Sequence, residues 1–327
     1  MQHLDPGKHP LAKEVSSTLP TPSNMAIQKV ALLGADGNLG PSVLSALLSH
    51  NFTVTVLKRA SSTSPSTYPS GVSVIKIHDS FAVESVTEAL RGQDAVITTV
   101  RGKGPQTDLQ HRIALACVAA GVQRFIPSDF GSVDSSSQWT MDLVPLYKNK
   151  TDARNYAAEL AEQNQAFSWT SLVCGHFFDW SLDFLHIYPQ RRSMDILDSG
   201  EQKWSASTLF RIGEATARIL LHPDETKNKI IYVQSFCVTQ NEVIKAFERA
   251  TGKEWERVEY EAKQYEVEEK RKADAGDAGA VENLIWMLGA LDADWRGKEN
   301  FAMGLLGLED EDLDEAVRKV VEEKGLV

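Results

Sequence analysis

Three glycines mark the point where the apolar run VALLGADGNLG, residues 30–40, changes from a strand-like to a helical pattern. They are Gly34, Gly37 and Gly40. Glycine costs conformational entropy, and a helix start does not require three of them, so we infer that something approaches the backbone closely here. After the first strand of a parallel sheet, such a turn places main-chain amides and the positive end of a helix dipole against the pyrophosphate of a dinucleotide. The turn therefore predicts a dinucleotide site.

The residues around this turn separate a dinucleotide site from an ordinary glycine turn. The spacing is G-x-x-G-x-x-G, whereas many dehydrogenases have G-x-G-x-x-G, and taken alone it is a weak signal. A strand pattern before the turn, Pro41 at the helix start and a second strand pattern after the helix supply the required context. We expect the turn and the end of the fourth strand to contact the cofactor through Gly34, Gly37, Asn38, Leu39, Gly40 and Thr99.

Two basic residues, Lys58 and Arg59, end the second strand pattern, TVTVLKRASS. At this position an acidic residue binds the ribose 2′-hydroxyl of NAD, whereas a basic residue accommodates the 2′-phosphate of NADP. A guanidinium meets phosphate with two parallel charge-assisted hydrogen bonds, so the pair predicts binding of NADP(H). The alternative is a pair of solvated surface cations. Asp36, inside the glycine turn, opposes a phosphate by its charge unless it caps the helix instead.

Motifs for other chemistries are missing. Tyr147 is followed at the fourth place by Thr151, so the tyrosine-x-x-x-lysine pair of ordinary short-chain dehydrogenases is absent. A G-x-S-x-G nucleophile elbow is also absent. Cys174 and His176 could bind a metal, but two ligands without a partner cluster are typical of a buried thiol and a pocket imidazole. We expect no metal.

The composition is that of a globular protein with small-molecule partners. The chain has 327 residues, 42% hydrophobic and 24% charged, enough for one large α/β domain with a smaller second region. Its formal net charge of −11 argues against a surface for nucleic acid or anionic lipid, which needs excess Lys and Arg. No stretch approaches the roughly 18 apolar residues of a membrane helix. We expect a small-molecule substrate, no nucleic acid or membrane partner, and a monomer or homodimer.

The cysteines and the first residues bear on the compartment. Cys117, Cys174 and Cys237 are far apart and lie in apolar sequence, which is typical of buried thiols in a reducing compartment. Residues 1–25 contain neither the apolar core of a secretion signal nor an arginine, and they are rich in Pro, Ser and Thr. We interpret them as a disordered extension, and we expect a cytoplasmic protein whose fold starts near Met25.

From Ala26 onward, short apolar runs alternate with helical patterns, as in a parallel sheet with crossover helices. The strand predictions are 29–33, 52–57, 72–77, 95–100, 124–126 and 169–174. The helix predictions between them include 39–49 and 107–120, which carry apolar stripes that would cover the sheet. The pattern predicts an α/β fold built on a doubly wound parallel sheet.

After Cys174 the regular alternation fails. A charged stretch at 265–280 and a helix at 281–291 indicate a second region built from irregular pieces, whereas residues 205–235 return in part to the framework. We therefore expect a smaller, interleaved α+β region that covers the substrate. The expected organisation is a disordered extension at 1–25, an NADP-binding Rossmann domain at 26–174 and a substrate-binding region at 175–327.

Several segments together resemble a known family. GADGNLG at 34–40, Arg59, RFIPSDFG at 124–131 and KTDARNYAAEL at 150–160 resemble the isoflavone reductase-like, NmrA-like branch of the atypical short-chain dehydrogenases. The most specific part is the proline, serine, acid, phenylalanine, glycine element that ends at Gly131. The likeness runs from about residue 26 to the C-terminus. It implies a Rossmann domain with a smaller substrate-covering region, and members include NADPH-dependent reductases of phenolic enones, quinone methides and benzylic ethers.

The resemblance also implies site residues. The family's catalytic lysine lies on the helix after this motif, four residues before an arginine, and Lys150 and Arg154 have that spacing. An ammonium near the substrate oxygen can stabilise the negative charge that hydride addition builds there, or donate a proton. The alternative is a solvated cation, like the neighbouring Lys148. Phe130 and Lys150 are also expected beside the cofactor.

A set of aromatic side chains resembles the wall of the family's substrate pocket and suits a flat substrate. Its members are Phe130, His176, Phe177, Phe178 and Trp180. Aromatic residues at such spacing are often core, and His176 could equally be a satisfied core histidine. Two positions depart from the family. Arg211 stands where relatives usually have an acid, and Ser132 stands where leucoanthocyanidin-reducing relatives have a histidine, which argues against flavan reduction.

These observations predict an NADPH-dependent oxidoreductase of secondary metabolism. Its substrate would be a small aromatic or conjugated compound of the carbonyl, quinone-methide or benzylic-ether type. The alternative is a non-catalytic regulator that senses NADP(H) and acts through a protein partner. Sensors of this branch typically lack the lysine, so Lys150 favours the enzyme.

Overall fold

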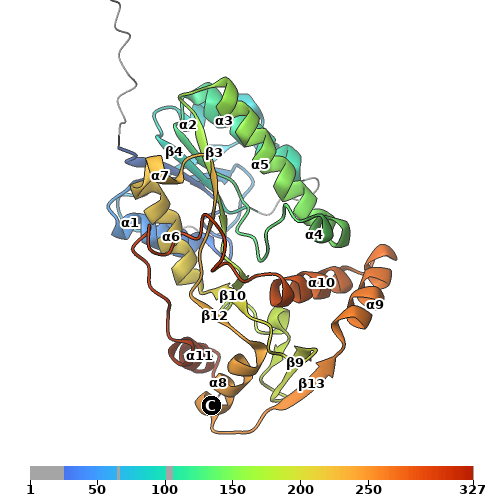
Figure 1. Cartoon of the computed structure of the whole chain (residues 1–327). Helices are drawn as coiled ribbons and strands as arrows, with labels where there is room; N and C mark the ends of the chain where they lie inside the picture. The colour runs from blue at the N-terminus through green and yellow to red at the C-terminus, as the bar shows by residue number, and fades with distance from the viewer. Residues whose placement is uncertain (1–25, 65–66, 101–105, 327) are drawn as a thin grey trace, which may run out of the picture.

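The computed structural model describes residues 26–64, 67–100 and 106–326 (Figure 1). The prediction of a disordered extension at 1–25 therefore lies outside the described residues. A seven-stranded sheet with its helices forms one half of this part of the chain, and two three-stranded sheets with their helices form the other. Among the helices of these residues, none combines the length and the apolar character that crossing a membrane requires.

The large sheet is parallel throughout, with the strand order β11-β6-β5-β4-β1-β2-β3. Its strands are β1 (Lys29–Leu33), β2 (Thr53–Arg59), β3 (Ser73–Ile77), β4 (Ala95–Thr98), β5 (Arg124–Ile126), β6 (Ser168–Val173) and β11 (Lys229–Tyr232). The predicted strands match β1 to β6 to within two residues at each end. The order reverses between β1 and β4, where sheets of this kind bind ligands beyond the carboxyl ends of their strands. Gly34 and Thr99 directly follow these two strands.

Helices cover both faces of this sheet because alternate strand residues point to opposite sides. The helices are α1 (Gly40–Ser49), α2 (Val83–Leu90), α3 (Gln106–Ala120), α5 (Pro145–Gln163) and α6 (Leu209–Leu221). In β1, Val30 and Leu32 share a core with α1 and α6, whereas Ala31 and Leu33 share one with α2, α3 and α5. The predicted doubly wound α/β fold is therefore confirmed (Figure 1).

Residues after Cys174 contribute to both halves of the molecule. Helix α6 packs beside α1 so closely that a Cβ atom at Gly213 would lie 2.5 Å from the main-chain oxygen of Ser42. After the short helix α7 (Pro223–Thr226), β11 pairs with β6 at the edge of the large sheet. Arg211 of α6 is buried and lies 3.5 Å from Glu311, so the departure from the family at this position creates a local ion pair.

The second region contains two small sheets with the orders β12-β10-β7 and β13-β9-β8. Its strands are β7 (His176–Phe177), β8 (Ile187–Tyr188), β9 (Ser193–Leu197), β10 (Trp204–Ser207), β12 (Phe236–Val238) and β13 (Glu256–Tyr260). The remaining helices are α4 (Gln138–Leu143), the 3₁₀ helix η1 (Asp183–Leu185), α8 (Gln240–Thr251), α9 (Ala262–Asp274), α10 (Ala278–Leu291) and α11 (Leu313–Glu323). Helix α4 lies on the side of the large sheet, next to α5.

The charged stretch 265–280, to which the sequence pattern assigned no helix, is largely helical. The first part of this stretch lies in α9 and the end in α10. Ion pairs between residues four apart support α9: Lys270 pairs with Asp274, and Lys272 lies 3.1 Å from Glu268. Tyr265 is buried and anchors the helix to the core.

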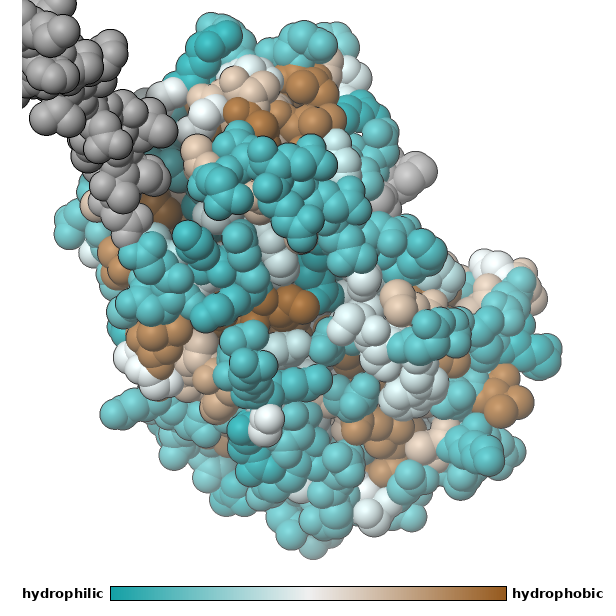
Figure 2. Space-filling model, turned by 45° about the horizontal axis from the view of Figure 1, so that its top comes forward, coloured by the Kyte–Doolittle hydropathy of each residue, from teal (hydrophilic) through white to brown (hydrophobic). Residues whose placement is uncertain are grey.

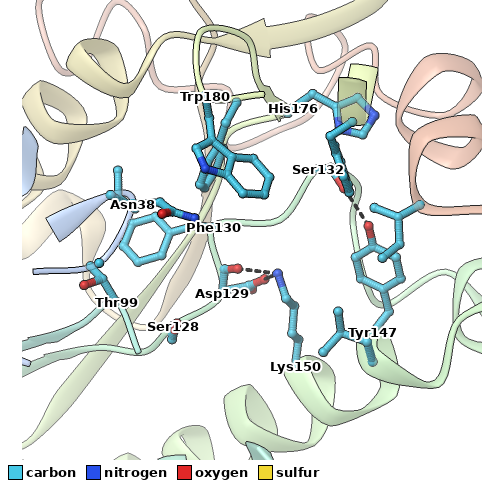
Figure 3. A pocket seen from close by; sticks show the side chains of 17 residues that line it. Asn38, Thr99, Ser128, Asp129, Phe130, Ser132, Tyr147, Lys150, His176 and Trp180 are labelled. Carbon is cyan, nitrogen blue, oxygen red and sulfur yellow. Dashed lines mark hydrogen bonds and ion pairs between the residues drawn. The ribbon is translucent and has the colours of Figure 1, made fainter. Parts of the chain in front are cut away.

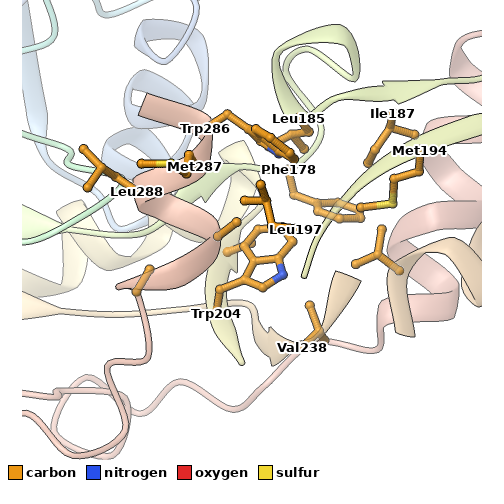
Figure 4. Packing of buried hydrophobic residues seen from close by; sticks show 14 of the residues in the cluster. Phe178, Leu185, Ile187, Met194, Leu197, Trp204, Val238, Trp286, Met287 and Leu288 are labelled. Atoms are coloured by element: carbon orange, nitrogen blue, oxygen red, sulfur yellow. The ribbon is translucent and has the colours of Figure 1, made fainter. Parts of the chain in front are cut away.

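An aromatic and aliphatic core holds the second region together (Figure 4). Phe178 is fully buried there, edge-on to Phe236 with ring centroids 4.8 Å apart. Trp286 and Met287 bring α10 into the same core. Helix α10 is thus fixed beside the carboxyl edge of the large sheet by apolar packing.

Figure 2 shows hydrophilic residues over most of one face of the molecule, with hydrophobic residues in small separate patches.

Candidate functional site

A cavity of about 360 Å³ lies where the carboxyl ends of β1 and β4 meet the second region (Figure 3). Many predicted site residues line it: Gly37, Asn38, Leu39, Thr99, Phe130, Lys150, His176, Phe177 and Trp180. The other lining residues were not predicted from the sequence: Ser128, Asp129, Ser132, Leu146, Tyr147, Gly175, Phe184 and Ile285. The cavity therefore brings together segments that are far apart in the sequence.

The three glycines of the turn serve different purposes. Gly34 has φ +94°, and a Cβ there would lie 2.6 Å from Oγ1 of Thr99, whose hydroxyl donates a hydrogen bond to the Gly34 carbonyl. A Cβ at Gly40 would overlap the Gly34 carbonyl oxygen, so Gly40 is required for packing of the helix start against the turn. A Cβ at Gly37 would meet a milder contact, 3.3 Å from the Gly34 oxygen. Gly37 is thus the glycine that leaves room beside the cavity.

The start of α1 fits an anion. No side chain caps this end, its N-cap residue is Leu39, and no acidic residue lies in its first turn. Helix starts expose amide donors that need acceptors, and the helix dipole favours negative charge there. Asn38 and Leu39 line the cavity at this end. The amides and open space of the turn therefore suit the pyrophosphate of a dinucleotide.

Asp36 does not cap α1 but pairs with Lys58, with 2.7 Å between Oδ2 and Nζ. The hydroxyls of Ser64 and Tyr68 also donate hydrogen bonds to this carboxylate. Burial by itself would raise the pKa of Asp36, but the hydrogen bonds from Lys58, Tyr68 and Ser64 outweigh it and lower the pKa. The Lys58 side chain is only 5% exposed. Lys58 therefore has an internal partner, and its charge is largely balanced.

Arg59 is exposed at the end of β2. It lines a groove of about 230 Å³ together with Gly34, Gly37 and Lys58. Gly37 lines both this groove and the larger cavity, so the two adjoin at the glycine turn. A dinucleotide laid across the turn would reach Arg59 at one end and the cavity at the other.

Lys150 projects from α5 into the cavity (Figure 3). Its Nζ donates a hydrogen bond to the main-chain carbonyl of Asp129, and it lies 3.9 Å from Oδ1 of the same residue. The side chain is 13% exposed. Lys148, two residues earlier, is 63% exposed and pairs with Asp152 at 2.8 Å on the surface. The ammonium of Lys150 is thus held in the cavity, whereas that of Lys148 is a solvated surface cation.

Asp129 and Arg154 form a buried ion pair behind Lys150. Arg154 Nε lies 3.1 Å from Oδ2 of Asp129, and both side chains are at most 3% exposed. Ser171 of β6 donates a hydrogen bond to the same carboxylate oxygen. Arg154 also lies 3.8 Å from Asp134. The arginine therefore balances most of the charge of Asp129, which sits in the motif element after β5 but had no assigned role.

The aromatic wall contains Phe130, Phe177, Trp180 and Phe184. The Trp180 ring centroid lies 6.4 Å from that of Phe177 and 5.6 Å from that of Phe184. Phe130 has φ +40°, which a non-glycine residue seldom adopts, and this backbone turn directs it into the wall. Phe178 does not line the cavity, because its side chain lies in the core of the second region.

His176 was expected to be either a pocket residue or a core histidine, and the structure shows features of both, since the side chain is buried and also lines the cavity. Its Nε2 lies 3.2 Å from the main-chain oxygen of Trp286, an acceptor, so this nitrogen carries the proton. Burial lowers the pKa of His176 to about 4. The imidazole is therefore neutral at pH 7 and links β7 to α10.

A pair of hydroxyls, Ser132 Oγ and Tyr147 OH, lies on the cavity wall with 2.5 Å between the oxygens. Burial raises the pKa of Tyr147, so the phenol stays protonated at neutral pH. Tyr147 and Lys150 are three residues apart on α5, a spacing that places both on one side of a helix. That spacing was the sequence signal that could have identified Tyr147.

Comparison with known proteins places the chain in a family. The NmrA-like family model matches residues 26–273. Oxidoreductase aprR of Aspergillus flavus is 33% identical over 299 residues, covering 90% of this chain and 98% of the relative. Oxidoreductase poxI of Penicillium oxalicum is 32% identical, covering 88% and 92%. A bifunctional pinoresinol-lariciresinol reductase of Sinopodophyllum hexandrum is 26% identical, covering 70% and 78%.

Solved structures share the fold. AtPrR2 with NADP+ and (+)pinoresinol has a TM-score of 0.72 and 22% identity, covering 90% of this chain and 99% of that one. The binary complex of leucoanthocyanidin reductase and NADPH from Vitis vinifera has a TM-score of 0.69 and 18% identity, with the same coverage. With the motifs, the fold and the family match in agreement, the chain belongs to the NmrA-like family, in its isoflavone reductase-like branch.

Proposed function

We propose that this oxidoreductase uses NADPH to reduce a small aromatic or conjugated substrate of the enone, quinone-methide or benzylic-ether type. The observation that carries the proposal is the position of Lys150. Its ammonium lies in a cavity that has the uncapped start of α1 on one side and aromatic side chains on another. A cation beside a flat, largely apolar pocket suits the oxygen of a conjugated substrate.

The residues present fit NADPH. The start of α1 offers main-chain amides for the pyrophosphate, and Arg59 offers an exposed guanidinium for the 2′-phosphate. Thr99 and Phe130 line the cavity beyond the turn, where the nicotinamide end would be held. When bound, NADPH supplies the hydride for the reduction. The related structures named with NADP+ and with NADPH support this assignment.

Lys150 would act on the substrate oxygen. Reduction of a conjugated carbonyl or quinone methide builds negative charge on that oxygen, and an ammonium at Nζ stabilises the charge or donates a proton. The hydrogen bond to the Asp129 carbonyl fixes the position of Nζ. Because Arg154 pairs with the Asp129 carboxylate, Lys150 does not have to neutralise that carboxylate by itself. Phe177, Trp180 and Phe184 would pack against the substrate and exclude water.

The test is NADPH oxidation with a panel of enones, quinones and benzylic ethers. Lys150→Met should lower kcat by about 10² to 10⁴, the range for loss of general acid catalysis, and should change NADPH affinity little. Lys148→Met is the matched control, since it makes the same change two residues away on the exposed side of α5. It should keep kcat within about twofold.

The same experiment separates the enzyme from a regulator. Tight NADPH binding without turnover of any panel member would favour a nucleotide sensor that acts through a protein partner. Turnover that survives Lys150→Met undiminished would retain the reductase but remove Lys150 from its chemistry.

A further inference from the structure

The Ser132–Tyr147 hydroxyl pair is a polar feature of the cavity that the proposed chemistry leaves unused. Tyr147 is 1% exposed, and Ser132 is partly exposed to the cavity. In the described part of the chain, each side-chain hydroxyl has the other as its one hydrogen-bond partner. The pair thus forms a small polar spot on the wall.

This pair has one more hydrogen-bond donor than the protein has acceptors for it. Two hydroxyls carry two hydrogens, and only one of these can lie between the two oxygens. The other hydrogen needs a separate acceptor, because a buried donor without one is costly. Ser132 and Tyr147 both line the cavity, so the acceptor is supplied from the cavity, by water or by a ligand.

The pair lies at a defined place relative to Lys150. The Nζ atom of Lys150 is 5.7 Å from the ring centroid of Tyr147, one turn earlier on α5. In Figure 3, Asn38 and Thr99 lie on one side of Lys150, and the pair lies on the other. A flat molecule whose reacting oxygen meets Lys150 would therefore extend toward the pair, on the side away from the glycine turn.

Besides the neutral imidazole of His176, the cavity wall contains several apolar side chains. Leu146 precedes Tyr147 on α5, and Phe184 and Ile285 line the cavity from the second region. Such a wall holds an aromatic ring without selecting among its substituents. A pair of hydroxyls in a largely apolar wall can fix the orientation of the substrate, because a polar substituent forms a hydrogen bond with the pair in one orientation only.

We infer that the Ser132–Tyr147 pair selects substrates with a second oxygen, and that it donates a hydrogen bond to a hydroxyl or carbonyl remote from the reacting group. This inference rests on the proposed function and specifies its substrate class. Aromatic compounds with two suitably spaced oxygens are preferred over analogues that lack the remote one. Ser132 and Tyr147 are specificity residues and take no part in the transfer of hydride.

The test compares chalcone with 4-hydroxychalcone and 4′-hydroxychalcone as substrates. For the native protein, kcat/KM should be about tenfold higher for the better hydroxychalcone than for chalcone, mainly through KM, as expected for one hydrogen bond. Ser132→Ala and Tyr147→Phe should each bring the ratio close to 1, because the preference for the hydroxylated compound is lost. A merely structural role would lower both rates together.

Tyr232→Phe is the matched control. Its hydroxyl donates a hydrogen bond to Asp134 at 2.8 Å, and Tyr232 does not line the cavity. The control should keep the tenfold ratio. An unchanged ratio in Ser132→Ala and Tyr147→Phe, or an equal loss in Tyr232→Phe, would overturn the inference and leave the reductase proposal intact.

Binding supplies a readout that does not need turnover. Calorimetry on the NADP+-saturated protein should give the same tenfold preference in Kd, lost in the two variants. Equal affinity for chalcone and both hydroxychalcones, or no binding of any of them, overturns the inference. A binding preference without NADPH oxidation by any panel member would instead count against the proposed function while supporting the pair as a recognition site.

Discussion

Lys58 and Asp36 form an ion pair across the glycine turn, with 2.7 Å between Nζ and Oδ2. The acid that opposes a bound phosphate and one of the two cations that favour it thus balance each other. Arg59, the next residue along β2, stays exposed at the groove. The charge available for a 2′-phosphate is therefore mainly that of Arg59.

Arg59→Gln should weaken NADPH binding by about tenfold or more, because a charge-assisted hydrogen bond contributes about 1.5–3 kcal/mol. NADH lacks the 2′-phosphate, so its Kd should change little. Titration of both nucleotides by calorimetry measures the two effects. Arg91→Gln, which changes an arginine paired with Glu88 on the surface, is the control and should alter neither Kd. Equal weakening of both nucleotides would contradict the assignment.

Gly40→Ala should mainly lower the stability of the protein, whereas Gly37→Ala should mainly lower its affinity for NADPH. A Cβ at Gly40 overlaps the Gly34 carbonyl oxygen, so this variant should lose about 1–3 kcal/mol of unfolding free energy, the usual cost of overpacking. A Cβ at Gly37 would lie 3.3 Å from the Gly34 oxygen, which a small shift relieves, and it would occupy space beside the cavity, so this variant should lose little stability and bind NADPH less tightly. Urea unfolding and nucleotide titration separate the outcomes. A Gly37→Ala protein with native affinity would show that the cofactor does not approach this residue.

Arg154→Met should destabilise the protein by about 3–5 kcal/mol, because it leaves Asp129 buried without its main counter-charge. Lys148→Met breaks an exposed pair on the same helix and should cost at most about 1 kcal/mol. Urea unfolding monitored by circular dichroism gives both values. Asp129→Asn combined with Arg154→Met should recover part of the loss, since the unpaired charge is removed; a double variant no more stable than Arg154→Met would contradict this explanation.

His176 should make stability depend on pH. Burial lowers its folded-state pKa from the ordinary 6.5 to about 4, so between these values the unfolded chain binds a proton that the folded chain does not. The unfolding free energy should therefore fall as the pH drops from about 6.5 to 4. His176→Gln should flatten this slope by up to one proton, measured by urea unfolding across the range. The exposed His78→Gln, which makes the same replacement outside the cavity, is the control.

The aromatic segment shows where sequence reasoning stopped. Phe177 and Phe178 are neighbours, and successive residues in an extended chain point to opposite sides. One of them had to face the cavity and the other the core, but only the packing against Phe236 shows that Phe178 is the core residue. Tertiary contacts were also needed to place the charged stretch in α9. Ion pairs along one side support this helix, and the buried Tyr265 attaches it to the core.

By itself, the sequence determined the doubly wound framework and the glycine turn, and its resemblance to the family indicated the candidate lysine. The framework and the turn rest on short-range signals, since the periodicity of a strand or helix and the motif at residues 34–40 each extend over about a dozen residues of sequence or fewer. Tertiary structure alone decided that Lys58 forms an ion pair with Asp36, that Arg154 forms one with Asp129, and that the hydroxyls of Ser132 and Tyr147 share a hydrogen bond. The reason is physical: a side chain's charge, hydrogen bonds and burial depend on partners that lie far away in the chain and come together only when the sheet and the second region pack.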